Sequence, residues 1–243
     1  MWVLALDTTT RDGGVALVKD DTVVVARPGE AGLSHAERVP ADLRAVLAKA
    51  GLSLGAIDVF AVATGPGGFT GLRIGLAAVQ GLAVALDRPV AGVPSLAALA
   101  WEVLDRDPDA AAAGALMDAS RGEIFGAAFG RPAVADPVGW PLAPLAPPAA
   151  ALPAAMLAAW QGRVPAGTAV AAACQPSAAA DAAAAGFRPV APAALLAGVI
   201  GRLAWRLNGT PYCGPASALA PEYVRRPDVE IERDRRRAAG RAG

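Results

Sequence analysis

The sequence predicts an α/β protein in two parts, and three patterns carry this prediction. A buried strand is expected over residues 57–63, and a glycine-rich turn leads from it into an apolar helix. Short apolar runs separated by a polar turn open the chain, which is typical of an antiparallel meander. The opening pattern around Asp7 then returns around Asp118, at the place where a second domain should begin.

The elements expected in the first part follow one another closely. Ser34 and Glu37 have capping-box spacing, because Ser34 can accept from the third helical N–H while Glu37 reaches back to the cap. The helix that they begin should end at Gly51, and Ser95 should cap a later helix. A charged, proline-interrupted stretch over residues 105–109 suits a domain boundary. Strands are expected over residues 2–6, 13–18, 22–26, 57–63 and 89–93.

The second part of the chain gives weaker signals. The proline-rich residues 131–153 should form an irregular surface loop. Residues 221–226 should form a short extended piece, and the polar, arginine-rich residues 227–243 a disordered tail. Helices are expected over residues 154–160, 177–185 and 195–207, and strands over residues 123–129 and 169–173.

The glycine turn is the first candidate site. Glycine accepts positive φ and lets another group approach the backbone, so the run over residues 64–75 marks a sharp turn or a close contact. The turn delivers the chain to a helix N-terminus, whose free N–H groups and positive dipole would favour a phosphate or a carboxylate. A tight connection without a ligand is an equally good interpretation. The candidate nucleotide-binding residues are Asp7, Thr9, Gly65, Gly67 and Gly68.

The helix after the turn is the second candidate site. Arg73 is the only charged residue between Gly71 and Leu86, so the helix has little with which to form a solvated face and should be buried on both sides. One apolar stripe can pack on the sheet. A second stripe, made mostly of small residues, would let another helix approach closely, from the same chain or from a partner. That stripe consists of Gly71, Gly75, Ala78 and Leu82.

Composition and motifs exclude several functional classes. Lys plus Arg and Asp plus Glu both number 22, so the net charge points neither to nucleic acid nor to a membrane surface. Neither lysine follows a glycine, which leaves no Walker loop, and no G-x-S-x-G elbow is present. The single histidine, His35, leaves no pair for zinc, and we interpret it as a surface residue of the first helical turn. We therefore expect no catalytic residue and no metal site.

The expected setting is a reducing cytoplasm. Cys174 and Cys213 are isolated and lack the spacing of a disulfide framework. Asp7 interrupts the first short apolar run, so a signal peptide is not expected. Prolines interrupt the uncharged residues 137–162, which rules out a membrane-spanning helix there. We expect no membrane among the partners.

Asp7 and Asp118 allow two interpretations. Each follows a strand and precedes hydroxyl residues, and in a two-lobed nucleotide-binding fold such carboxylates position a metal and phosphates across a cleft. The chain would then be an ATP-dependent small-molecule kinase that uses Asp7 and Asp118 with magnesium. Each aspartate can instead cap its own turn through an Asx hydrogen bond. We favour this second interpretation, because the sequence after Asp7 lacks the glycine that would let a phosphate approach the backbone.

With these motifs, the sequence resembles the TsaB (YeaZ-type) family of the bacterial tRNA threonylcarbamoyladenosine machinery, part of the actin-like, sugar-kinase and Hsp70-like superfamily. The resemblance covers residues 1 to about 130 and then a short stretch near the end. Gly68 departs from the pattern, since the family usually has serine there. The matching motifs lie over residues 4–10, 34–37, 65–75, 92–96, 117–123 and 221–226.

The resemblance implies two lobes of actin-like, ribonuclease H-like mixed sheet with flanking helices, the second lobe being reduced. The first lobe would span residues 1–105, and the last helix, over residues 192–209, would pack back on it. The second lobe would span residues 110–190, ahead of the tail over residues 227–243.

The resemblance also implies a non-catalytic scaffold that binds and supports TsaD, which transfers the threonylcarbamoyl group to the adenosine next to the anticodon of tRNAs. TsaD carries a metal-binding pair of histidines, which this chain lacks. TsaE would complete the assembly, TsaC would supply the activated intermediate, and tRNA would be reached only through the complex. Without TsaD the chain would form a homodimer, and any ATP would bind at the interface of the complex. The implied partner-binding residues are Ser34, Glu37, Thr70, Gly71, Arg73, Ile74, Gly75 and Ala78.

Overall fold

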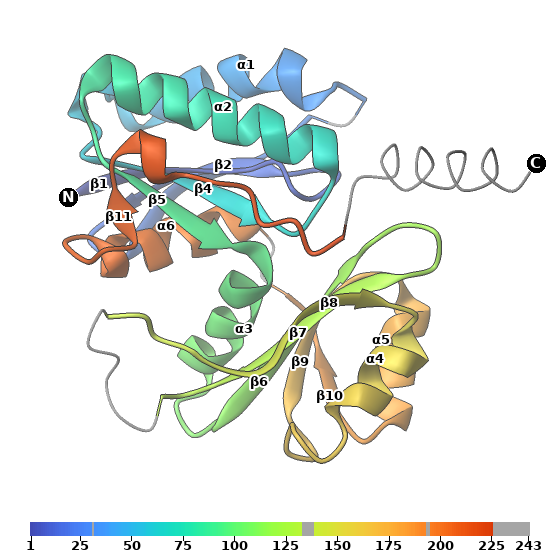
Figure 1. Ribbon diagram of the computed structural model, residues 1–243. Helices are drawn as coiled ribbons and strands as arrows, with labels where there is room; N and C mark the ends of the chain where they lie inside the picture. The colour runs from blue at the N-terminus through green and yellow to red at the C-terminus, as the bar shows by residue number, and fades with distance from the viewer. Residues whose placement is uncertain (31, 133–138, 193–194, 226–243) are drawn as a thin grey trace, which may run out of the picture.

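The computed structural model of the chain describes residues 1–30, 32–132, 139–192 and 195–225. Within these residues, two mixed β-sheets form two lobes, with helices on the outer face of each sheet and two further helices between the sheets (Figure 1). The predicted α/β class is confirmed. The helices are α1 (His35–Ala50), α2 (Phe69–Leu86), α3 (Ser95–Arg106), α4 (Pro153–Trp160), α5 (Pro176–Ala184) and α6 (Leu196–Leu207), with the short 3-10 turns η1 (Leu54–Ala56) and η2 (Ala216–Ala218).

The first lobe is built on a six-stranded sheet. Its first three strands form the predicted antiparallel meander, and the next two run parallel to the first strand. The strand at one edge has only two residues, too few for any sequence pattern to indicate it. In spatial order the strands are β11 (Cys213–Gly214), β5 (Val90–Pro94), β4 (Val59–Gly65), β1 (Trp2–Asp7), β2 (Gly14–Lys19) and β3 (Thr22–Pro28).

Helices α1 and α2 cover the outer face of the first sheet (Figure 1). The capping box of α1 is confirmed, because the Ser34 hydroxyl accepts from the Glu37 N–H at 3.4 Å and the Glu37 carboxylate accepts from the Ser34 N–H at 2.8 Å. Gly51 ends this helix in the left-handed conformation, with φ of 66°. Helix α2 is the only described helix that is long and apolar enough to cross a membrane, yet 33% of it is buried inside the protein, on the side that packs on the sheet.

Helices α3 and α6 lie between the two sheets and give the lobes a common core. Their apolar residues pack in one cluster with strand residues from both sheets, such as Ala61 of β4 and Ala115 of β6. Helix α6 packs on β1, β2 and β4, although it follows the second lobe in the sequence. Helix α3 packs more extensively on the second sheet than on the first. The two lobes are therefore joined by buried apolar surface and not by a bare linker.

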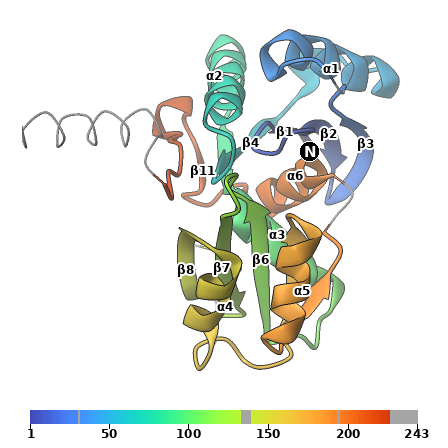
Figure 2. The same ribbon diagram turned by 90° about the vertical axis from the view of Figure 1, so that its right-hand side faces the viewer.

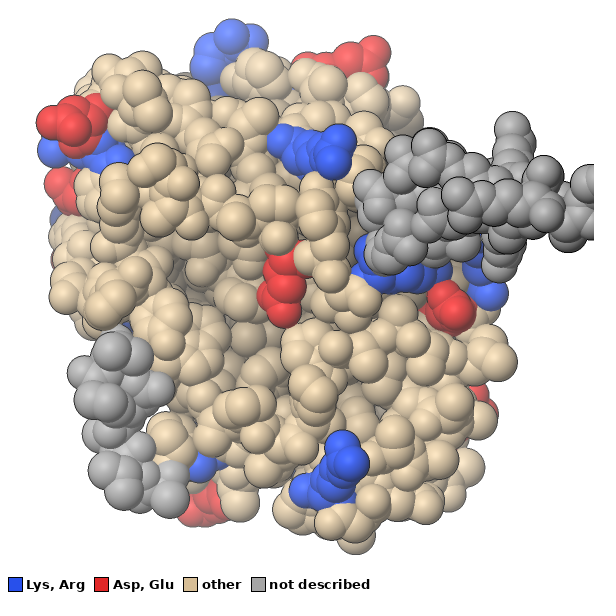
Figure 3. Space-filling view, in the orientation of Figure 1, with Lys and Arg blue, Asp and Glu red and all other residues tan. Residues whose placement is uncertain are grey.

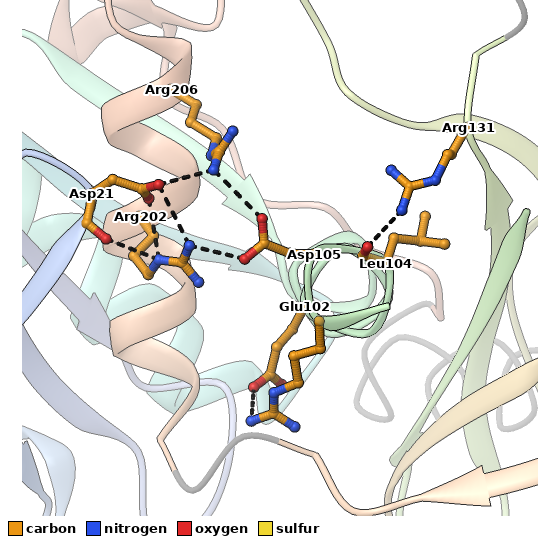
Figure 4. Close-up of polar contacts among 8 residues, drawn as sticks. Asp21, Glu102, Leu104, Asp105, Arg131, Arg202 and Arg206 are labelled. Carbon is orange, nitrogen blue, oxygen red and sulfur yellow. Dashed lines mark hydrogen bonds and ion pairs between the residues drawn. The ribbon is translucent and has the colours of Figure 1, made fainter. Parts of the chain in front are cut away.

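Ion pairs fasten α6 to the β2–β3 turn of the first lobe and to α3 (Figure 4). The Arg202 Nε atom lies 3.1 Å from Asp21 Oδ1 in the β2–β3 turn, and its Nη2 atom lies 2.8 Å from Asp105 Oδ2 on α3. Arg206 Nη2 contacts the same two carboxylates at 2.8 and 3.4 Å. Both guanidinium groups also lie over the ring of Trp101. A partly buried network of this kind is screened less by salt than isolated surface pairs, so it helps to hold α6 against α3 and the first sheet.

The second lobe contains a strand where the sequence predicted an irregular loop. Within residues 131–153, Ala143–Ala151 forms β8 and pairs with β7, so the loop prediction is wrong for this stretch. Its prolines are tolerated because β8 is an edge strand, whose outward N–H positions need no ladder partner. Helices α4 and α5 cover the outer face of this sheet (Figure 1). The strands in spatial order are β10 (Arg188–Val190), β9 (Ala169–Ala173), β6 (Ala112–Asp118), β7 (Ile124–Gly130) and β8 (Ala143–Ala151).

One further local prediction is corrected. Ser95 does not cap α3, because Pro94 holds the N-cap position and the buried Ser95 hydroxyl instead donates to Thr9 Oγ1 at 3.2 Å. Residues 221–225, where a short extended piece was predicted, are the end of a strap, residues 215–225, that runs along α2 to the mouth of the cleft between the lobes. The predicted tail over residues 227–243 lies outside the described residues.

Candidate functional site

A cleft opens between the two lobes at the ends of β1 and β6. Its cavity, about 660 Å³ in volume, is lined by the hairpin after Asp7, by the first turns of α1 and α2, and by Asp118 and Ser120 of the second lobe. A smaller hollow of about 200 Å³ adjoins it beneath the strap. Burial raises the pKa of Glu222, which lines this hollow. Of the two aspartates that the sequence singled out, Asp118 lines the cleft, whereas Asp7 is buried behind the hairpin that lines it.

The Asp7 carboxylate is occupied by its own hairpin. One oxygen accepts from the Thr9 N–H at 2.8 Å and from the Thr9 hydroxyl at 2.6 Å, and the other accepts from the Thr10 hydroxyl at 2.9 Å. The residue is buried, with 1% of its surface exposed. The predicted Asx turn at Asp7 is confirmed, and a metal here would have to displace these donors.

Asp118 is exposed and also holds its own turn. Its Oδ1 atom accepts from the Ser120 N–H at 3.1 Å, so the second predicted Asx turn is confirmed, and it accepts from Gln175 at 3.5 Å. Among the described residues, no group of three or more His, Cys, Asp or Glu side chains is placed to hold a metal ion. Both carboxylates thus hold their own turns, and the kinase alternative with Asp7 and Asp118 stays a prediction.

The glycine turn packs on the hairpin that holds Asp7. A Cβ on Gly67 would lie closer to Thr9 than the 3.0 Å that real Cβ atoms keep, and the Gly68 N–H donates to the Thr9 carbonyl at 3.0 Å. Gly65 has φ of 107°, a conformation that favours glycine. The chain's own hairpin thus supplies a structural reason for Gly67, and the backbone conformation supplies one for Gly65. Nucleotide binding at Gly65, Gly67 and Gly68 stays a prediction.

Two reactive side chains border the cleft, and both are held in unreactive forms. His35 Nδ1 lies 2.6 Å from Arg38 Nη2, and because a guanidinium can only donate, the histidine proton is on Nε2. Burial, and then the charge of Arg38, lowers the pKa of His35, which keeps the ring neutral. Burial also raises the pKa of the Cys174 thiol to about 11, and Asp118 adds to this shift, so the nucleophilic thiolate is disfavoured.

The outward face of α2 is the second candidate site. Helix α2 stands between α1 on one side and the strap on the other (Figure 2). In Figure 3, charged side chains lie mainly along the rim of the upper part of the molecule, and the surface between them, where this helix lies, is mostly uncharged. Val84 has 73% of its surface exposed and is the most exposed large apolar side chain described. The other exposed residues of this face are Thr70, Ala77, Gly81 and Ala85, with Ile74 and Ala78 partly buried beside them.

This arrangement revises the sequence interpretation of α2. The helix is not buried on both sides, because one of its faces lies open. Gly71 and Gly75, which the sequence placed at a partner surface, are buried, and a Cβ on either would clash with Thr8. They let the helix lie close to the chain's own hairpin. The exposed small residues Ala77 and Gly81 were missed, although their spacing of four residues marks a common helical face.

The remaining predicted partner residues lie at the edges of this face. Arg73 and Thr70 are exposed on the first turns of α2. Ser34 and Glu37 lie at the start of α1, and the hydrogen bonds from Ser34 lower the pKa of the Glu37 carboxyl. Their side chains are engaged with each other in the capping box. Their position is compatible with an interface, but their local role is to begin the helix.

Comparison with known proteins places this fold and site in one family. The family model of TsaD, tRNA N6-adenosine threonylcarbamoyltransferase, matches residues 24–136. The tRNA threonylcarbamoyladenosine biosynthesis protein TsaB of Escherichia coli is 37% identical over 131 residues, 54% of this chain and 56% of that protein. The TsaB protein of Bacillus subtilis is 31% identical over 125 residues, 51% of this chain and 53% of that protein. The matches thus span about half the length of these curated relatives.

A solved structure extends the likeness over the whole fold. YeaZ from Pseudomonas aeruginosa is 30% identical with a TM-score of 0.68, and the alignment covers 91% of this chain and all of that chain. The molecule is therefore a two-lobed protein of the actin-like class. Within that class, the chain belongs to the TsaB (YeaZ-type) family.

Proposed function

We propose that this chain is a non-catalytic subunit in tRNA threonylcarbamoyladenosine biosynthesis, in the cytoplasm, and that it binds a TsaD-type transferase through the outward face of α2. The observation that carries the proposal is the open, charge-poor surface of this helix. Val84 is 73% exposed, and a Cβ on Gly81 would meet nothing within 4 Å. An apolar face that the described part of the chain leaves uncovered is the kind of surface that a protein partner covers.

The small residues of the face favour a helix as the covering element. Ala77, Gly81 and Ala85 project little from the helix axis, and the distance between packed helices shortens as the side chains at the contact shrink. Thr70 and Ile74 continue the surface toward the first turn of α2. A helix of the partner could therefore lie along α2.

The similarity to TsaD supports the choice of partner. The matched residues, 24–136, include both α1 and α2, so proteins of the TsaD family carry a segment comparable to this surface. A face that pairs with its own copy about a two-fold axis can pair in nearly the same way with a related face. We therefore expect a homodimer when TsaD is absent and a heterodimer when it is present. TsaE, TsaC and tRNA would be reached through that complex.

The chemistry of the cleft supports a non-catalytic role. Asp7 is occupied by three hydrogen bonds, His35 is neutral and bonded to Arg38, and the Cys174 thiol has a raised pKa. None of these groups is poised as a base or a nucleophile. The chain would support the transferase by binding it, without supplying a reacting group.

A charge on the open face tests the proposal. Ala77→Glu should abolish the complex with the TsaD-type transferase of the same organism, and also the homodimer, because the interface would bury an unpaired carboxylate. Light scattering after size exclusion, together with calorimetric titration, measures both associations, and thermal unfolding should stay unchanged. Gly75 is unsuitable for this test, because it is buried under Thr8.

The control places the same change on the second lobe. Ala158 is an exposed alanine of α4, so Ala158→Glu has the same cost in helix propensity but lies away from the proposed interface. It should leave both associations intact. Equal affinities for the unsubstituted chain and Ala77→Glu would refute binding through α2.

A further inference from the structure

The strap is fastened to both lobes. The Gln80 side chain on α2 donates to the carbonyls of Ala216 and Leu219, each at 3.2 Å. The Glu222 N–H donates to the Thr64 carbonyl at 2.7 Å, at the end of β4. Arg225 then pairs with Glu123 of the second lobe at 2.7 Å. The strap therefore presents its side chains in fixed positions beside α2.

One side chain of the strap completes a three-part stack at the border of the α2 face. The ring of Tyr223 stacks on Phe69 with ring centres 5.3 Å apart and an interplanar angle of 30°. The Arg73 guanidinium carbon lies 3.9 Å from the Phe69 ring centre, and its Nε donates to the Tyr223 hydroxyl at 3.0 Å. Tyr223 and Arg73 are both exposed. The guanidinium is thus held in one orientation at the surface.

The stack leaves hydrogen-bonding capacity unused. Only Nε of Arg73 has a partner in the described part of the chain, and no described carboxylate or carbonyl accepts from its two terminal nitrogens. A planar guanidinium with a free edge matches the two oxygens of a carboxylate. Because the stack already restricts the side chain, binding would cost it little further entropy.

We propose that Arg73, held by Phe69 and Tyr223, recognises a carboxylate side chain of the TsaD-type partner at the edge of the α2 interface. The inference rests on the proposed function and names the partner chemistry at one position. Arg73 lies one helical turn before Ala77, so the carboxylate site is continuous with the apolar face. Arginine and tyrosine are also the residue types that most often dominate binding energy at interfaces. The strap thereby becomes part of the recognition surface.

Three substitutions test the inference by calorimetric titration with the transferase. Arg73→Ala should weaken the complex roughly tenfold at low salt, and the loss should shrink at about 0.5 M salt, where the charge contribution is screened. Arg73→Lys should recover only part of the affinity, because an ammonium cannot form the paired bonds. Tyr223→Phe keeps the ring stack but removes the acceptor for Nε, so it should cause a smaller loss with the same salt dependence.

The control is Arg163→Ala, which removes an exposed arginine from the second lobe and should change neither affinity nor salt dependence. If Arg73→Ala binds the transferase as tightly as the unsubstituted chain does at low salt, this inference is overturned and the proposed function is not. Failure of the unsubstituted chain to bind the transferase would overturn it together with the proposed function. A loss for Arg73→Ala that is equal at low and high salt would also contradict recognition of a carboxylate.

Discussion

Gly75 and Gly81 lie on different faces of the same helix, Gly75 in a buried contact and Gly81 on the exposed surface. A Cβ on Gly75 would lie closer than 3.0 Å to the Thr8 hydroxyl, whereas a Cβ on Gly81 would meet nothing within 4 Å. A glycine inside a helix costs about 1 kcal/mol relative to alanine. At Gly75 the close approach of Thr8 explains why a glycine is needed despite that cost. At Gly81 nothing in the described chain does, which supports an external partner on that face.

The comparison shows why composition alone misplaces an interface. The stripe of small residues read from the sequence, Gly71 to Leu82, turns toward α1 and the Asp7 hairpin, and a different set of small residues faces outward. Both sets satisfy the same helical period. Which of them meets solvent depends on where the hairpin and the strap lie, and this is a property of the whole fold.

The largest expected effect is on the inner face. Gly75→Ala should lower the free energy of unfolding by about 2 kcal/mol, because the new methyl group overpacks the buried contact with Thr8. Urea denaturation measures this change. The Thr8 hydroxyl is buried and has no hydrogen-bond partner, so Thr8→Ala should remove the obstruction at little cost. The double variant should recover most of the lost stability; if the two losses simply add, the contact is not the cause.

On the outer face, a glycine-to-alanine substitution should stabilise the chain instead of destabilising it. Gly81→Ala should raise the free energy of unfolding of the isolated chain by roughly 0.5–1 kcal/mol, through helix propensity alone. The same methyl group should weaken association with the transferase, because a partner helix could no longer approach as closely. Denaturation and titration of one variant therefore separate the two roles. A stabilised chain with unchanged affinity would remove Gly81 from the interface.

The smallest expected effect is on the pH dependence of the free energy of unfolding. It arises from His35, which lies beside Gly71 on the buried side of α2. Burial lowers the folded pKa of His35 below the ordinary histidine value of 6.5, so the unfolded chain binds the proton more readily. The free energy of unfolding should be greatest above pH 6.5, should fall as the pH drops from there to the folded pKa, and should level off below it. Binding at the outer face should not follow this curve.

Proton NMR can follow this titration directly, because the chain has a single histidine. His35→Gln keeps an acceptor for Arg38 but does not titrate, so it should flatten the pH dependence in this range. A folded-state midpoint at or above 6.5 would contradict the assigned neutral form.

Local hydrogen-bond patterns were the most predictable part of the fold. The capping box at Ser34 and the Asx turns at Asp7 and Asp118 depend on residues two or three positions apart, so their sequence spacing is sufficient to indicate them. Strand β8 was not predictable, since its prolines suggest a loop and only its place at a sheet edge makes them acceptable. Strands β10 and β11 have too few residues to show any period.

The candidate site also has features that the sequence predicts and features that only the structure shows. The charge-poor character of α2 and the scarcity of groups for catalysis follow from the residues themselves. The stack of Phe69, Arg73 and Tyr223 joins positions far apart in the chain, and no local pattern links them.

The sequence by itself determined how α1 begins and how the turns at Asp7 and Asp118 form, because those choices are made by neighbouring residues that compete for the same backbone hydrogen bonds. Only the tertiary structure decided which face of α2 is open, how α6 joins the lobes, and where the strap places Tyr223. These outcomes depend on contacts between distant segments, whose positions are fixed only when the common core is packed.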